Sequence, residues 1–361
     1  MKKIDLIVGA RPNFIKAFPV YDALAEVGSF DLRLINTGQH YDKNMVDIFF
    51  RQLKMKQPDI DLMVGSGSHA EQTGKIMIAL EKVFTENRPD LVIVFGDVNS
   101  TIAAALAAAK LHIPVAHVEA GLRSFDRNMP EEINRILTDQ ISDILFITSP
   151  EVEDHLLKEG KDKKRIHFVG NTMIDSLIRF EPFFNGENIK DKYRLKNKDY
   201  ILITLHRPSN VDDPANLEQL ITSLDKVAKI AHCLWPVHPR SRGKIETVSI
   251  KNHDRLIMTE PLGYLEFMAL QRDAVAVITD SGGIQEESTF FGVPCLTVRD
   301  NTERPITIER GTNRLVGTDY SKIPETVRKT IAENNEFKIP ELWDGNASGR
   351  IAEIVMNKLL V

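Results

Sequence analysis

The chain has few of the features that mark disulfide-linked, membrane or nucleic-acid-binding proteins. It contains only two cysteines, Cys233 and Cys295, without a CxxC pair, which is typical of buried thiols in a reducing compartment. It has no apolar run near the roughly 20 residues that cross a bilayer, and its N-terminus lacks a signal-peptide pattern. A net charge of −5 without a basic tract does not favour nucleic acid. We therefore expect a cytoplasmic enzyme with neither nucleic acid nor a membrane as partner.

The composition and the order of predicted elements indicate two α/β domains. Hydrophobic residues make up 42% and charged residues 27% of the 361 positions, as in ordinary globular enzymes. Buried strands alternate with helices twice along the chain, which predicts two Rossmann-like domains facing a cleft. We expect the first domain at residues 1–170 and the second at 171–346. The final helix, within 347–361, is expected to pack back on the first domain.

One stretch of the second half predicts a nucleotide-binding turn. An apolar run at 274–279 reads as a buried strand, Ser281-Gly282-Gly283 as a turn, and the residues from Ile284 as a helix. Glycine allows close approach of a ligand, and a helix N-terminus attracts phosphate. We place Glu286 and Glu287 in the first turn, where a carboxylate would suit ribose hydroxyls. The alternative is a tight turn without a ligand.

Acidic residues follow two consecutive predicted strands of the first half. Asp97 comes after the strand at 91–95, and Glu119 after the strand at 115–118. Ligands of open α/β sheets bind at this edge, although an N-cap role would also explain Asp97. Glu131 follows Pro130 at the start of a helix, where it could simply favour the helix dipole.

The first predicted strand also ends in a glycine turn. Gly9-Ala10-Arg11-Pro12 leads into a helix that contains Lys16, so Arg11 and Lys16 lie where anions collect. Each could equally be a solvated surface cation. The turn is not G-x-G-x-x-G, so dinucleotide binding is not indicated.

Motifs along nearly the whole chain resemble the non-hydrolysing UDP-N-acetylglucosamine 2-epimerases, which have the glycosyltransferase-B type of fold. No single motif is specific, but together and in this order they are. They are Gly9-Ala10-Arg11-Pro12 with Lys16, Gly38-Gln39-His40, Gly96-Asp97, His117 to Arg123, Pro130 to Arg135, Gly170-Asn171-Thr172, His206-Arg207, Pro236-Val237-His238, Asp280 to Glu287 and Arg299 to Pro305.

The resemblance implies a reaction and a set of site residues. The expected reaction interconverts UDP-N-acetylglucosamine and UDP-N-acetylmannosamine through anti elimination of UDP to a 2-acetamidoglucal and re-addition. It implies no metal and no cofactor, a homodimer, and a place in polysaccharide biosynthesis. The implied catalytic residues are Asp97, Glu119, Glu131 and His206. The implied substrate-binding residues are Arg11, Lys16, Asp97, Glu119, His206, Phe267, Ser281, Gly282, Gly283, Glu287 and Arg304, with phosphate on the serine–glycine turn, ribose on Glu287 and uracil near Phe267.

The chain departs from the commonest family pattern at positions linked to a second, activating UDP-sugar site. Pro208 stands where many members have a second Arg, and Glu71 where an Arg is frequent. The loop between Glu119 and Glu131 also differs and carries Arg127. Two other functions remain open: a 2-epimerase of a modified sugar such as a UDP-diacetamido-glucuronic acid, and a glycosyltransferase of the same fold.

Overall fold

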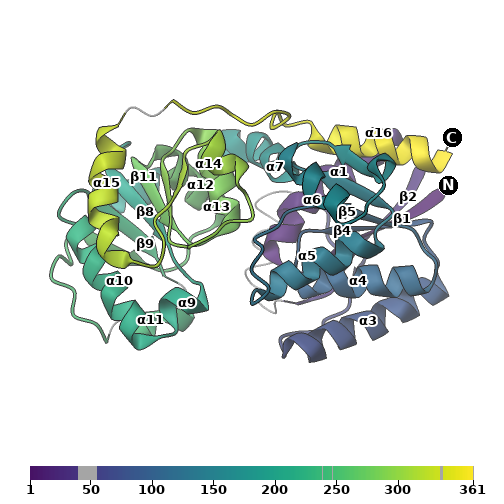
Figure 1. The fold of residues 1–361 in the computed structure, drawn as a ribbon, viewed down its shortest axis with the longest axis horizontal. Coiled ribbons are helices and arrows are strands. Elements are labelled where there is room, and N and C mark those ends of the chain that lie inside the picture. Colours follow the sequence, from purple (N-terminus) through teal and green to yellow (C-terminus); the bar gives the residue numbers. More distant parts are fainter. Residues whose placement is uncertain (40–54, 238, 246, 334–335, 361) are drawn as a thin grey trace. The chain divides into compact units, whose positions relative to one another are not determined.

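The computed structural model describes residues 1–39, 55–237, 239–245, 247–333 and 336–360. The chain divides into two compact units, Met1–Arg179 with Glu341–Val361, and Phe180–Pro340. Each unit is a parallel sheet with helices on both faces (Figure 1). The predicted α/β class is confirmed.

The first unit is built on a sheet of order β3-β2-β1-β4-β5-β6-β7. Its strands are β1 (Lys2–Val8), β2 (Phe30–Asn36), β3 (Ile60–Asp61), β4 (Leu91–Phe95), β5 (Val115–Val118), β6 (Ile144–Ile147) and β7 (Ile166–Phe168). Its helices are α1 (Arg11–Val27), α3 (His69–Glu86), α4 (Asn99–Lys110), α5 (Pro130–Ile141), α6 (Glu151–Lys158), α7 (Thr172–Phe180) and α16 (Ala347–Leu360).

The second unit repeats this plan with the order β10-β9-β8-β11-β12-β13. Its strands are β8 (Tyr200–Thr204), β9 (His232–Pro236), β10 (Leu256–Thr259), β11 (Ala276–Thr279), β12 (Cys295–Thr297) and β13 (Asn313–Leu315). Its helices are α8 (Glu187–Tyr193), α9 (Pro208–Val211), α10 (Pro214–Val227), α11 (Pro239–Ile245), α12 (Tyr264–Asp273), α13 (Gly282–Phe291), α14 (Ile306–Glu309) and α15 (Ile323–Ala332).

Each sheet reverses its strand order at one place, between β1 and β4 in the first and between β8 and β11 in the second. From these central strands the chain winds outward in opposite directions. The crevice at the carboxyl ends of such strands is where doubly wound sheets bind ligands. The fold therefore predicts one ligand-binding edge in each unit.

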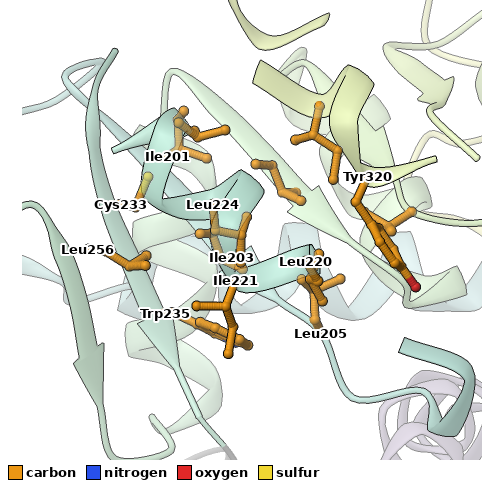
Figure 2. Close-up of a cluster of buried hydrophobic side chains, with 14 of the residues drawn as sticks. Ile201, Ile203, Leu205, Leu220, Ile221, Leu224, Cys233, Trp235, Leu256 and Tyr320 are labelled. Atoms are coloured by element: carbon orange, nitrogen blue, oxygen red, sulfur yellow. The ribbon is translucent and has the colours of Figure 1, made fainter. Parts of the chain in front are cut away.

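The core of the second unit shows why its strands are continuous apolar runs. Successive side chains of a strand point to opposite faces, so Ile201 and Ile203 of β8 enter one hydrophobic cluster while Tyr200 and Leu202 enter another. Figure 2 shows the first cluster, in which Ile201 and Ile203 lie among side chains of β9 and α10 such as Trp235. A sheet buried on both faces is held rigidly, which fixes the strand ends that carry polar residues.

The first unit is also closed by its C-terminal helix. Asp175 of α7 accepts hydrogen bonds from the backbone N–H groups of Ala347 (3.1 Å) and Ser348 (2.7 Å) at the start of α16. The Ser176 hydroxyl donates to the Ile15 carbonyl of α1 at 2.5 Å. These bonds explain why the units divide after Arg179, at the end of α7, while the sequence places the boundary at residue 170.

Two stretches have a charged or polar composition that predicts a helix, residues 174–195 and 44–53. The first is not one helix but is interrupted between α7 and α8, because Pro182 lies in a short 3-10 turn and Gly186 precedes α8. The second falls outside the described residues. Among the described helices, none is both long and apolar enough to cross a membrane.

Candidate functional site

The turns that follow β1 and β4, where the first sheet reverses its strand order, are closely packed. The turn after β1 begins at Gly9, where a Cβ atom would collide with the Ser100 hydroxyl of α4. The turn after β4 begins at Gly96, which has a φ of +64° and lies against Lys16 and Glu119, 3.3 and 3.5 Å from where its Cβ would be. Gly9 therefore has no room for a side chain, while at Gly96 the left-handed backbone conformation favours glycine.

Glu119 and Lys16 form a buried ion pair at this edge. The Lys16 ammonium contacts Glu119 Oε2, and the two side chains are 8% and 6% exposed. Glu119 has a φ of +76°, a left-handed conformation that is rare for residues other than glycine. Such strain persists where surrounding contacts enforce it and is common at functional sites. Lys16 is thus placed as the counterion of the acid, rather than as an isolated cation of the surface.

Asp97 is paired in the same way with a different cation. Its Oδ2 accepts from Nη1 of Arg135, which is buried in α5 and also contacts Glu132 at 2.6 Å. The Asn134 amide donates to the Asp97 carbonyl at 2.9 Å. The Asp97 side chain is 26% exposed, so it can still reach a ligand. These contacts, rather than an N-cap bond, hold it.

The two adjacent acids at the start of α5 have opposite environments. Glu132 is buried and accepts from the backbone N–H groups of Ser124 and Phe125, both at 2.9 Å. Burial opposes its ionisation, but these bonds and Arg135 hold the pKa of the Glu132 carboxyl below its ordinary value. Glu132 therefore fixes the loop that precedes α5. Glu131 is exposed.

The anion site expected in the second unit lies at the start of α13. The helix begins at Gly282, two residues earlier than the expected Ile284, and Ser281 is an N-cap without a side-chain hydrogen bond. The first N–H groups of a helix have no intrahelical partner. Together with the helix dipole, they offer a place for phosphate that no side-chain cap occupies.

The expectation that Glu286 and Glu287 lie in the first turn is wrong. The first turn holds no acid, because the helix already starts at Gly282. Glu286 is buried and pairs with the Arg304 guanidinium, its Oε2 lying 2.9 Å from Nε. Its role is therefore that of a counterion. Glu287 is buried as well, with the Gln271 amide 3.3 Å from its Oε2.

Arg304 belongs to a buried chain of alternating charges. Arg304 forms ion pairs with both Glu303 and Glu286. Glu303 forms a further ion pair with Nη2 of Arg299, at 2.7 Å. A Cβ atom at Gly282 would collide with Nη1 of Arg304 and would lie 2.5 Å from Oε1 of Glu303. The guanidinium thus lies directly against the helix N-terminus, with its charge largely balanced by carboxylates.

His206 and Asp280 meet where the second sheet reverses. Nδ1 of His206, which follows β8, lies 3.0 Å from Oδ1 of Asp280, which follows β11. Asp280 is fully buried and also accepts from the Arg207 N–H at 2.9 Å and the Asn210 amide at 3.0 Å. Burial disfavours the charge, yet His206, Asn210 and Arg207 outweigh it and lower the pKa of Asp280. The carboxylate orients the half-exposed imidazole, so that Nε2 remains for a ligand.

The remaining predicted residues are placed less distinctly. Phe267 is half-buried in α12 and packs against the hydrophobic cluster of the second unit that contains Tyr200 and Leu202. Arg11 is the first residue of α1, and its side chain is outside the part of the structure that can be described. His40 and His238 also lie outside the described residues.

The hollows of the described surface do not coincide with these strand ends. An open groove of 510 Å³ lies beside the edge strand β13 and includes Ile308 and Leu315, and one of 190 Å³ includes Tyr193 and Glu260. Neither contains the acids of the first unit or the start of α13. The candidate site is defined instead by its chemistry, that is, by the charged side chains that are paired at the strand ends of each unit.

Sequence reasoning missed the partners of the predicted residues. Arg135, Asp139, His117 and Asp280 are buried polar side chains that bind the turns bearing Asp97, Glu119 and His206. The available signal was the presence of charged residues inside otherwise apolar elements. Buried charges must be paired, but the sequence does not say with which residue.

Comparison with known proteins identifies the class of protein and then its family. The likeness to solved structures assigns the two sheets to the glycosyltransferase-B type of fold. The model of the UDP-N-acetylglucosamine 2-epimerase family matches residues 22–356. The chain belongs to that family.

Individual relatives are similar over nearly their whole length. A UDP-N-acetylglucosamine 2-epimerase of Methanococcus maripaludis is 42% identical, with 99% of both chains covered. A UDP-2,3-diacetamido-2,3-dideoxy-D-glucuronate 2-epimerase of Pseudomonas aeruginosa is 43% identical, over 97% of this chain and 98% of the relative. The solved Methanocaldococcus jannaschii UDP-GlcNAc 2-epimerase, in complex with UDP-GlcNAc and UDP, has a TM-score of 0.90 and 42% identity, covering 98% of this chain and 99% of the other.

Proposed function

We propose that the protein is an isomerase that interconverts UDP-N-acetylglucosamine and UDP-N-acetylmannosamine. The observation that carries this proposal is the pair of acids, Asp97 and Glu119, each held against a buried cation at the reversal point of a sheet. Family membership supplies the substrate class. Inversion at C2 requires removal and return of a weakly acidic proton, which positioned carboxylates can perform.

In this proposal the second unit holds the nucleotide. Ser281, Gly282 and Gly283 direct backbone N–H groups at the diphosphate, and Arg304 lies behind them. Glu287 receives the ribose hydroxyls. Phe267 lies near uracil and Arg11 binds an anion, assignments that rest on the family resemblance. Such donors stabilise the negative charge that develops on UDP as it leaves.

The first unit provides the proton chemistry. Asp97, Glu119 and Glu131 act as acid and base on the sugar, with Lys16 as the counterion of Glu119. His206, oriented by Asp280, meets the diphosphate or the sugar. Elimination breaks the C1–O bond as the C2 proton leaves, which gives UDP and a 2-acetamidoglucal. Re-addition of UDP with a proton on the other face gives the epimer.

A 2-epimerase acting on a UDP-diacetamido-glucuronic acid is the second candidate. It is favoured by the similar relative that carries that name and by Arg127. This residue is exposed in the loop before α5, and no ion pair or hydrogen bond of its side chain is found among the described residues. A cation there suits a carboxylate at C6 of the sugar.

Incubation with UDP-N-acetylglucosamine alone tests the proposal. We expect UDP-N-acetylmannosamine to accumulate to an equilibrium mixture, observed by the anomeric proton signals. A glycosyltransferase would leave the compound unchanged without an acceptor. Turnover of only the C6-oxidised diacetamido sugar would select the second candidate, and we then expect Arg127→Ala to lower it.

The assembly and cellular role follow from the family resemblance. We propose a homodimer that works in the cytoplasm and serves polysaccharide biosynthesis. Both cysteines are buried free thiols, which agrees with a reducing compartment. Light scattering of the purified chain measures its oligomeric state directly, and a monomer at micromolar concentration would contradict the proposed homodimer.

A further inference from the structure

A buried polar network connects the turns that bear the two acids. His117 lies in β5 and Asp139 in α5, and both are fully buried. The imidazole Nδ1 lies 2.7 Å from Oδ1 of Asp139, and Nε2 lies 2.7 Å from the carbonyl oxygen of Gly96. Gly96 directly precedes Asp97. One ring therefore connects helix α5 to the turn that follows β4.

The other oxygen of Asp139 holds the neighbouring turn. Oδ2 accepts from the Gly121 N–H at 3.1 Å and from Nη2 of Arg123 at 2.7 Å. Gly121 lies two residues after Glu119, and both have positive φ angles, +81° and +76°. A single carboxylate thus binds the turn after β5 directly, and the turn after β4 through His117.

The donors around the Asp139 carboxylate hold the network together. A carbonyl oxygen can only accept, so Nε2 of His117 donates to Gly96. The pKa of Asp139 is lowered although burial opposes it, because His117 and Arg123 lie against the carboxylate. Arg123 is balanced further by Glu159, 2.6 Å away.

We propose that His117 and Asp139 are positioning residues for the epimerisation: they hold Asp97 and Glu119 at a fixed separation by binding the backbone of both turns. This inference rests on the proposed function, because turnover of the UDP-sugar is the quantity that tests it. Neither residue touches the sugar. A displacement of about 1 Å at reacting groups can cost ~10²-fold in rate, so loosening either turn should affect turnover far more than nucleotide binding, which the second unit provides.

Two substitutions of His117 test its two hydrogen bonds one at a time. The amide of His117→Asn reaches about as far as Nδ1, so it keeps Asp139 and loses the Gly96 carbonyl. The amide of His117→Gln reaches about as far as Nε2, so it keeps the Gly96 carbonyl and loses Asp139. We expect His117→Asn to lower kcat by ~10²-fold, with KM and the Kd of UDP within about threefold of the wild type. His117→Gln should retain at least ~10-fold more turnover than His117→Asn.

The control is His167→Asn, which changes a half-buried histidine of β7 whose Nε2 has no hydrogen-bond partner among the described residues; we expect full turnover. Equal kcat in the two His117 variants, or a loss that appears in KM alone, would overturn the inference. Thermal unfolding of each variant identifies a loss that comes from misfolding, and in that case Asp139→Asn, which keeps the shape of the side chain, must show the same fall in kcat. Wild-type protein inactive on every UDP-sugar would instead refute the proposed function.

Discussion

The two units share one strand order, yet their reversal points carry opposite chemistry. In the first unit the turns bear carboxylates, each beside its own buried cation: Glu119 with Lys16 and Asp97 with Arg135. In the second unit the corresponding turn gives uncapped backbone N–H groups, and its arginine is already balanced by acids. The difference teaches that the scaffold determines where polar groups gather, while the turn residues determine which charges they present. In the proposed function the first edge transfers protons and the second holds phosphate.

Removing the acids should separate these roles most strongly. We expect Asp97→Asn, Glu119→Gln and Glu131→Gln each to lower kcat by at least ~10²-fold, the scale of general acid–base catalysis. The Kd of UDP, measured by calorimetry, should change less than about threefold. Glu81→Gln changes an exposed acid of α3 and should leave kcat unaltered. Near-full turnover in all three acid variants would show that the wrong carboxylates have been assigned.

Gly282→Ala should have the converse effect. Its Cβ would collide with Arg304 Nη1 and lie 2.5 Å from Glu303 Oε1, so the helix start must shift. We expect the affinity for UDP to fall at least ~10-fold, and the free energy of unfolding to fall by about 1–3 kcal/mol, as for overpacked sites. Gly243→Ala is the control, since no atom lies within 4 Å of that Cβ. Unchanged UDP affinity in Gly282→Ala would disprove the phosphate assignment.

Acid should weaken the second unit through Asp280. The pKa of this buried carboxyl lies below its ordinary value of 3.8. Its pairing therefore stabilises the fold fully above pH 3.8, and the contribution is lost as the pH falls through the lowered pKa. We expect Asp280→Asn to show a shallower decline of unfolding free energy as the pH falls below about 4 in urea titrations. Parallel curves for the two proteins would contradict this linkage.

The smallest effect is expected for activation by substrate. Glu71 is exposed and pairs with Lys75 at 2.6 Å, while Gln72 and Gln39 are buried and joined by a 3.2 Å hydrogen bond. If the second site of the family lies here, a carboxylate at position 71 in place of a cation disfavours binding of a second UDP-sugar through charge repulsion. We therefore expect a hyperbolic dependence of rate on UDP-N-acetylglucosamine concentration. A sigmoidal curve would show that an activating site is present.

The sequence predicts the fold class and family well, because they depend on local patterns. Apolar runs ending in glycine turns mark the strands, and the order of motifs indicates the family, which the comparisons confirm. Pairings are harder: Asp139 and His117 are separated by 22 positions, and only the fold brings them together. The roles of Asp97, Glu119, Glu131 and His206 stay predictions.

The start of α13 shows a second limit. Two glycines favour a turn by propensity, so the helix was expected only at Ile284, yet packing against Arg304 and Glu303 includes both glycines in the helix. Tertiary contacts override local propensity at such a place. That shift of two residues moves Glu286 from a ribose ligand to the counterion of Arg304.

Proton exchange during turnover is the most direct test of the division between proton-transferring and phosphate-holding edges. The protein is incubated with UDP-N-acetylglucosamine in deuterium oxide, and the C2 position of the product is observed by proton NMR. Elimination and re-addition predict UDP-N-acetylmannosamine with deuterium at C2, accompanied by slow release of UDP and the glucal. An epimer that retains its original C2 hydrogen would contradict the mechanism.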